Sequence, residues 1–153
     1  MTGCSAELGA LAVGIEGDGE PVYAAFNEMG RLLGMAWQIT RDVADMWGRH
    51  GDGMTSSNAL NKKKSLPLIH AMETSPVAAK RELAGIYVKR VLDNSDISRI
   101  IEILDQAGSR GFADSKAQEL ADRAMASLDT AGLTPEAREG LEGLAQWALE
   151  GPA

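Results

Sequence analysis

Apolar residues recur along the chain at helical spacing and not in strand-like alternation. Within residues 97–104, 113–128 and 141–148 they come three or four positions apart, which is the period of one face of an α-helix. No stretch alternates apolar and polar residues over several positions, and β-branched residues are sparse. The pattern therefore predicts an all-α protein.

Clusters of Gly, Pro, Asn, Asp and Ser divide the chain into about seven expected helices. These breaks lie at residues 17–21, 48–61, 73–76, 93–95, 108–111 and 131–135. Two breaks also carry a helix start, because Ser75 precedes Pro76 and Thr134 precedes Pro135. In each pair the hydroxyl predicts an N-cap, and the proline predicts the first helical position.

The length of 153 residues suits one domain with its own hydrophobic core. We therefore expect residues 1–153 to form a single all-α domain, a helical bundle of about seven helices. The Gly- and Ser-rich stretch over residues 48–61 is the long loop of the pattern. Loops of this length often cover a functional site, so we expect a lid-like loop here.

The segment over residues 21–47 is apolar on two sides, which predicts a helix inside the bundle. One apolar stripe consists of Val22, Phe26, Met29, Leu33 and Trp37. The other consists of Leu32, Met35, Ile39, Val43 and Met46. A polar stripe shares this helix at positions i, i+3, i+4 and i+7 and consists of Gln38, Arg41, Asp42 and Asp45. Buried charge is costly unless it is paired or hydrogen-bonded, so we expect this polar stripe to line a wet cavity or cleft.

Two groups of charged residues, one on this helix and one after it, are candidates for binding a metal ion or a phosphate. Asp42 and Asp45 present carboxylates one turn apart, a spacing that suits a hard divalent cation such as Mg²⁺. The alternative is a solvated surface on which Arg41 pairs with them.

The three lysines at 62–64 precede an expected helix start, where cations and free N–H groups can hold a phosphate. The alternative is a solvated run of charge.

The net charge and the cysteine content argue against several functions and sites, namely nucleic-acid binding, membrane-surface binding, a disulfide and a zinc site. With 22 acidic against 15 basic residues, the net charge is −7, which disfavours binding to nucleic acid or to an anionic membrane. Cys4 is the single cysteine, so no intrachain disulfide can form, and His50 and His70 add too few ligands for a zinc site. No apolar run is long enough to span a bilayer and no signal peptide is evident, so we expect a cytoplasmic protein.

Two motifs in the expected order resemble the trans-polyprenyl synthases, the family of isoprenyl diphosphate synthases. Residues 33–48 read LGMAWQITRDVADMWG, and residues 63–68 read KKSLPL. They are similar to the second aspartate-rich motif of that family, aromatic-Gln-x-x-Asp-Asp-x-x-Asp, and to the Lys-x-Ser/Thr-Leu-Pro element that follows it. Residues 7–12 and 97–147 resemble the flanking helices. The chain thus resembles the C-terminal half of the isoprenoid synthase fold.

The resemblance implies a Mg²⁺-dependent prenyl transfer in isoprenoid biosynthesis. An allylic diphosphate loses its diphosphate, and isopentenyl diphosphate captures the carbocation. By position, Asp42 and Asp45 match the metal-binding aspartates, while Gln38 and Lys63 match residues that contact the diphosphate. Arg41 stands where the leading aspartate belongs, and its guanidinium is a candidate partner for the diphosphate or for Asp45. No catalytic residue is assigned.

Further departures from the family pattern imply an incomplete site. Asn58 stands at the position of the loop aspartate, and no Asp-Asp pair occurs, so the first aspartate-rich motif is absent. Met1 falls inside what resembles a helix from the middle of the family fold. We therefore expect the chain alone to be inactive or incomplete. We also expect an exposed apolar patch, with association into a homodimer or hetero-oligomer.

Three functional hypotheses follow. In the first, the chain is the C-terminal portion of a prenyltransferase and contributes Asp42, Asp45 and Lys63 to its site. In the second, it is a non-catalytic partner or regulatory subunit of a prenyl synthase that has lost metal ligands, which Arg41 and Asn58 favour. In the third, it is an unrelated helical adaptor whose polar stripe is a salt-bridged surface.

Overall fold

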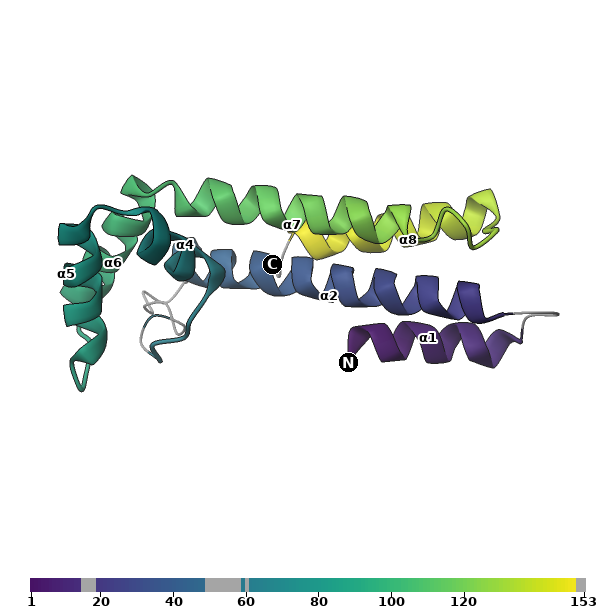
Figure 1. Cartoon of the computed structure of the whole chain (residues 1–153), viewed down its shortest axis with the longest axis horizontal. Helices are drawn as coiled ribbons and strands as arrows, with labels where there is room; N and C mark the ends of the chain where they lie inside the picture. Colours follow the sequence, from purple (N-terminus) through teal and green to yellow (C-terminus); the bar gives the residue numbers. More distant parts are fainter. Residues whose placement is uncertain (15–18, 49–58, 60, 151–153) are drawn as a thin grey trace. The chain divides into compact units, whose positions relative to one another are not determined.

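The computed structural model describes residues 1–14, 19–48, 59 and 61–150, and within them the chain is helical. Seven α-helices, and no strand, occur in this part of the chain (Figure 1). They are α1 (Thr2–Val13), α2 (Glu20–Trp47), α4 (Leu66–Thr74), α5 (Val77–Val88), α6 (Asn94–Gln106), α7 (Ser109–Ala126) and α8 (Pro135–Glu150). The all-α prediction with about seven helices is confirmed. Most of the predicted lid-like loop, with His50 and Asn58, lies outside the described residues.

The helices form two compact units. The first unit combines Met1–Thr40 with Lys116–Ala153, and the second is Arg41–Ser115. The first unit therefore holds α1, most of α2, the later part of α7 and α8. The second holds the end of α2 together with α4, α5 and α6. The expectation of a single domain over residues 1–153 stays a prediction.

The core of the first unit consists of residues from α2, α7 and α8. Its buried members include Met29, Leu32, Leu33, Ala36, Leu120, Ala124, Leu128, Ala145 and Ala148. On α2, Leu32, Leu33 and Met29 come from both predicted apolar stripes, so the helix is buried on two sides as expected. Met35 is the exception, because 44% of it is exposed and its sulfur lies 3.5 Å from a guanidinium nitrogen of Arg31. The prediction that Met35 belongs to a buried apolar stripe was therefore wrong.

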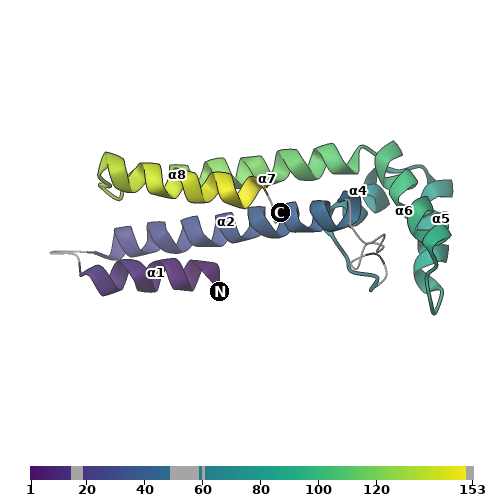
Figure 2. The ribbon, with the colours of Figure 1, turned by 180° about the vertical axis from the view of Figure 1, so that it is seen from behind.

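Helix α1 runs beside α2, as both ribbon views show (Figures 1 and 2). Glycines permit this close approach. A Cβ atom on Gly30 would lie 2.6 Å from the carbonyl oxygen of Thr2, and a Cβ on Gly34 would lie 2.1 Å from the Thr2 hydroxyl oxygen. Such distances are not tolerated between non-bonded atoms, so glycine at both positions is a packing requirement.

The core of the second unit joins α4, α5 and α6 to the end of α2. Its buried members include Met46, Leu68, Ala71, Leu83, Ile86, Leu92, Ile97, Ile100, Ile103 and Leu104. Ile97, Ile100 and Leu104 come from the helical periodicity of residues 97–104, and all three are buried. Tyr87 packs against this core, and burial raises its pKa to about 12.

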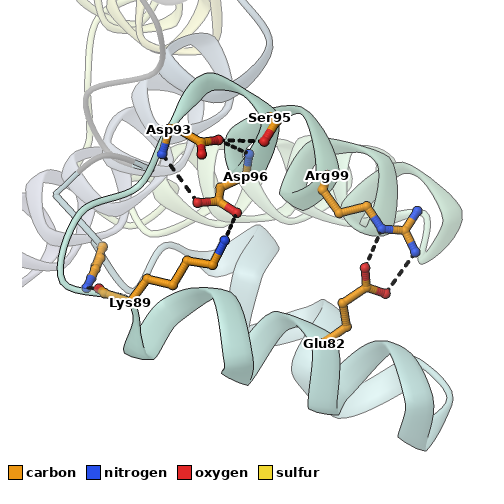
Figure 3. A network of polar contacts seen from close by, with 7 residues as sticks. Glu82, Lys89, Asp93, Ser95, Asp96 and Arg99 are labelled. Atoms are coloured by element: carbon orange, nitrogen blue, oxygen red, sulfur yellow. Dashed lines mark hydrogen bonds and ion pairs between the residues drawn. The ribbon is translucent and has the colours of Figure 1, made fainter.

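Polar contacts hold α5 to α6 around this core (Figure 3). Asp93 and Asp96 form a capping box at the start of α6, and Lys89 donates to the carboxylate of Asp96 at 2.6 Å. The hydrogen bond to Asp96 raises the pKa of Lys89. Further along, Arg99 makes two hydrogen bonds to Glu82, and these bonds lower the pKa of that carboxyl. The start of α6 and its pairing with α5 thus use charged groups.

The two predicted N-caps have different outcomes. Thr134 caps α8 as predicted, because its hydroxyl oxygen accepts a hydrogen bond from the Ala137 backbone N–H at 3.2 Å. The prediction for Ser75 was wrong. Pro76 is the N-cap of α5 and no side chain caps this helix, while Ser75 ends α4. The residue before a proline favours extended backbone, and Pro76 is itself extended at ψ 153°, so the helix begins one residue later.

Among the described helices, none is both long enough and apolar enough to cross a membrane.

Candidate functional site

The end of α2 carries three residues of the polar stripe, Arg41, Asp42 and Asp45, and all three belong to the second unit. Asp42 is 6% exposed, Asp45 is half-buried and Arg41 is exposed. Successive residues of an α-helix are rotated by about 100°, so these three side chains project within an arc of about 100°. Asp45 lies between the other two on that face. Along this face, burial thus increases from Arg41 through Asp45 to Asp42.

Lys63 meets this stripe from the segment before α4. Its ammonium Nζ lies 2.9 Å from Oδ1 of Asp42, across 21 residues of sequence. The Lys63 side chain is 47% exposed, whereas the Asp42 side chain is 9% exposed. The structure thus brings together two predicted site residues, and the ammonium group lies between a buried carboxylate and solvent.

The start of α4 fixes the place of Lys63. Ser65 is the N-cap of this helix, and Pro67 follows within its first turn, where the missing N–H of proline costs no hydrogen bond. Ser65 is 1% exposed, and its hydroxyl forms no hydrogen bond within the described part of the chain. Lys62 turns away from the site, since its ammonium donates to the backbone carbonyl of Lys89. The three lysines are therefore not one uniform run of solvated charge.

Trp47, at the end of α2, is held by α6 and α7. Its indole N–H donates to Oδ1 of Asp105 at 2.8 Å, and the guanidinium of Arg110 lies 5.9 Å from the ring centre. These contacts hold the helix end that carries Asp42 and Asp45. Sequence reasoning missed them, because Asp105 is 58 residues away and no spacing signals the pair.

Gln38 lies on α2 within the first unit and is exposed. It borders a cavity of about 410 Å³ together with Arg31, Met35 and residues from the start of the chain. The predicted contact with a diphosphate stays a prediction.

A second cavity of the first unit is apolar and measures about 480 Å³. Met29, Leu33 and Trp37 of the first apolar stripe line it from α2, and Trp147 lines it from α8. The rings of Trp37 and Trp147 stack with their centres 6.3 Å apart. Trp37 belongs to the predicted apolar stripe and is half-buried, whereas 55% of Trp147 stays exposed. This apolar lining suits a long hydrocarbon chain.

The donor set at the stripe decides whether it suits Mg²⁺. Within the described ranges, no three His, Cys, Asp or Glu side chains gather in a way that could hold a metal ion. Of the two expected ligands, Asp42 already pairs with Lys63. Mg²⁺ is commonly held by one or two carboxylates together with waters and substrate phosphates. At this site Mg²⁺ would have to displace the ammonium group of Lys63 from Asp42, so we assign no step to a metal.

Comparison with known proteins gives a consistent result. The family model described as "Polyprenyl synthetase" matches residues 1–104. A geranylgeranyl diphosphate synthase from Mycobacterium tuberculosis is 32% identical over 139 residues, covering 89% of this chain and 39% of that protein. An octaprenyl diphosphate synthase from Escherichia coli is 30% identical over 127 residues, covering 81% of this chain and 38% of that protein. The chain thus spans about two fifths of the length of these relatives.

Solved structures agree in fold. A geranylgeranyl pyrophosphate synthetase from Pyrococcus horikoshii superimposes with a TM-score of 0.81 at 28% identity, covering 99% of this chain and 46% of that one. A polyprenyl synthase from Caulobacter crescentus, complexed with calcium and isoprenyl diphosphate, superimposes with a TM-score of 0.85 at 25% identity. This superposition covers 99% of this chain and 46% of the Caulobacter chain.

Proposed function

Because the chain belongs to the polyprenyl synthetase family, we propose that it is the C-terminal portion of a prenyltransferase. The complete enzyme would condense an allylic diphosphate with isopentenyl diphosphate in isoprenoid biosynthesis. The relatives named above are geranylgeranyl and octaprenyl diphosphate synthases, which supports this reaction class. The contribution of this chain is a binding site for the diphosphate group and a wall for the hydrocarbon chain.

The observation that carries the proposal is the contact between Lys63 and Asp42. A buried carboxylate holds an accessible ammonium group at a fixed place beside the start of α4. Arg41 adds an exposed guanidinium on the neighbouring helix α2. Fixed cations of this kind stabilise the negative charge that develops on a departing diphosphate.

The apolar cavity of the first unit suits a hydrocarbon chain. Its aromatic and aliphatic wall, with Trp37 and Trp147, offers burial to such a chain and excludes water from it. An allylic diphosphate has an apolar chain and an anionic head. The first unit by itself thus offers a surface for the apolar chain, and the second unit by itself offers cations for the anionic head.

Magnesium dependence belongs to the proposal for the complete enzyme, where the resemblance implies it. The roles of Asp42 and Asp45 as Mg²⁺ ligands stay predictions. So does the expectation of a homodimer or hetero-oligomer, which the exposed Leu8 and Leu11 on α1 support. The cytoplasmic location likewise stays a prediction.

Calorimetric titration of farnesyl diphosphate into the purified chain tests the proposal. We expect saturable binding that the Lys63→Ala variant weakens by on the order of tenfold, since one charge-assisted contact is lost. Lys80→Ala is the matched control, because this lysine donates to the backbone carbonyl of Glu73 at the end of α4, away from the stripe. Equal affinity of wild type and Lys63→Ala would contradict the proposed site.

The second candidate is a non-catalytic partner of a prenyl synthase, and Arg41 is the observation that favours it. Its guanidinium occupies a position at which the resemblance implies a metal-binding carboxylate. Under this hypothesis farnesyl diphosphate does not bind. The chain would instead change the turnover of a full-length polyprenyl diphosphate synthase when added at equimolar concentration, which a product assay measures.

A further inference from the structure

We infer that the side chains at the end of α2, together with Lys63, bind the diphosphate group without a divalent cation, and that Arg41 and Lys63 supply the positive charge. This inference rests on the proposed function and deepens it. It concerns the half-site formed by Arg41, Asp42, Asp45 and Lys63, all within the second unit. It also gives the two carboxylates a role other than metal binding, which is to hold the two cations.

The balance of charge at the half-site is the first argument. Two cations and two carboxylates sum to zero formal charge. Lys63 contacts Asp42 directly at 2.9 Å. Arg41 stands four residues before Asp45 on α2, and side chains at that spacing are neighbours on a helix surface. Each carboxylate therefore has a cation within reach, and a Mg²⁺ ion would have to compete with both cations for its ligands.

The difference in burial is the second argument. Asp42 is 6% exposed, so an incoming anion meets the ammonium group of Lys63 and not the carboxylate behind it. Arg41 is exposed as well. Its planar guanidinium can donate two parallel hydrogen bonds to phosphate oxygens, a geometry that lysine lacks. The accessible side of the half-site is thus cationic, although its net charge is zero.

Arginine at position 41 changes the local charge by two units relative to an aspartate there. Two units is the charge of one Mg²⁺ ion. A half-site with aspartate at this position would carry a net charge of −2 and would repel a diphosphate unless a divalent cation lay between them. With Arg41 the bridging cation is not needed. The guanidinium thus takes the electrostatic place of a metal ion in binding.

Titration with inorganic diphosphate, in the presence of Mg²⁺ and in the presence of EDTA, tests this inference on the whole chain. We expect the dissociation constants under the two conditions to agree within about threefold. The Arg41→Asp variant should lose binding in EDTA by on the order of tenfold or more and regain it with Mg²⁺. Titration of Mg²⁺ alone should give saturable binding to Arg41→Asp but not to wild type.

Two further variants make the result specific. Arg81→Asp carries the same change of charge at an exposed position of α5 and should bind diphosphate like wild type. Arg41→Gln removes the cation without adding a carboxylate, so it should weaken binding in EDTA without creating a response to Mg²⁺. Circular dichroism verifies that each variant keeps its helix content.

The possible results separate this inference from the proposed function. If wild type binds diphosphate only with a divalent cation, in the manner of the complex of calcium and isoprenyl diphosphate in the Caulobacter relative, the inference is wrong and the proposed function stands. If wild type binds under neither condition, both are wrong. Equal binding in Mg²⁺ and EDTA, together with the acquired metal response of Arg41→Asp, supports the inference.

Discussion

The hydroxyl group of Tyr87 on α5 is buried and has no hydrogen-bond partner among the described residues. Burial raises the pKa of this phenol to about 12, because the phenolate would lose its hydration. The same burial makes the neutral hydroxyl unfavourable, since it gives up hydrogen bonds to water and gains none. Tyr87 therefore reduces the stability of the second unit.

We expect Tyr87→Phe to stabilise the protein by about 1 kcal/mol, since phenylalanine keeps the ring and removes the unpaired hydroxyl. Urea unfolding near pH 7 measures the change. Tyr23, which is half-buried at the start of α2 and whose hydroxyl is not among the buried unpartnered groups, supplies the control. A loss of stability in Tyr87→Phe larger than that in Tyr23→Phe would contradict the interpretation.

The raised pKa of Tyr87 also predicts a pH dependence. The folded-state pKa of about 12 lies above the ordinary value of 10.0, so the ionisation of Tyr87 leaves the free energy of unfolding unchanged below about pH 10 and lowers it as the pH rises toward 12. Wild type should thus lose more stability than Tyr87→Phe between pH 9 and pH 11.5. Absorbance of tyrosinate near 295 nm follows the titration, and a single transition near pH 10 would contradict the assignment.

At the scale of the helix, glycine decides how closely α1 approaches α2. The backbone of Thr2 occupies the place where a side chain on Gly30 would begin. By contrast, a Cβ on Gly9 of α1 would meet no atom within 4 Å. Both glycines lie inside a helix, but only Gly30 is required by the packing of its neighbours.

We expect Gly30→Ala to destabilise the protein by about 1–3 kcal/mol, because α1 would have to move away from α2. Gly9→Ala is the matched control, and it should be neutral or stabilise by up to about 1 kcal/mol through its better helix propensity. Thermal and urea unfolding of both variants measure the difference. Equal effects of the two substitutions would show that the close approach is not a requirement.

Helices were largely predictable from the sequence because their signals are local. The break before α8 and its cap at Thr134 use neighbouring residues. Of the periodic apolar residues of α6, Ile97, Ile100 and Leu104 are buried as expected, whereas Ile101 is half-buried. The Ser75 prediction was wrong because the conformation of Pro76 moved the helix start by one residue. In the candidate site, motif resemblance linked Lys63 to Asp42, but their pairing and the contact of Trp47 with Asp105 depend on tertiary packing.

At the scale of the molecule, the chain has the fold of about half of a polyprenyl synthase. The structural relatives cover 99% of it, while it covers 46% of each of them. Helix α1 exposes Leu8 and Leu11, three residues apart on one face, with exposed fractions of 58% and 45%. Apolar side chains exposed together in this way favour association with another protein surface.

We expect wild type to self-associate as its concentration rises, and the double substitution Leu8→Glu and Leu11→Glu to reduce this association, because charged side chains are costly to bury at an interface. Sedimentation velocity over a concentration series measures the change. Val88→Glu is the control, since Val88 is 82% exposed in the second unit. A wild type that stays monomeric throughout would contradict homo-oligomerisation.

The three tryptophans give each unit its own optical probe. Trp37 and Trp147 stack in the first unit, so their paired transitions should produce an exciton signal in circular dichroism that vanishes when α8 separates from α2. Trp47 in the second unit lies beside Arg110 and Asp105, and in a variant with Trp37→Phe and Trp147→Phe its fluorescence alone responds to the release of the α2 end. Circular dichroism of the wild type and fluorescence of this variant therefore report whether the two units melt together or one after the other.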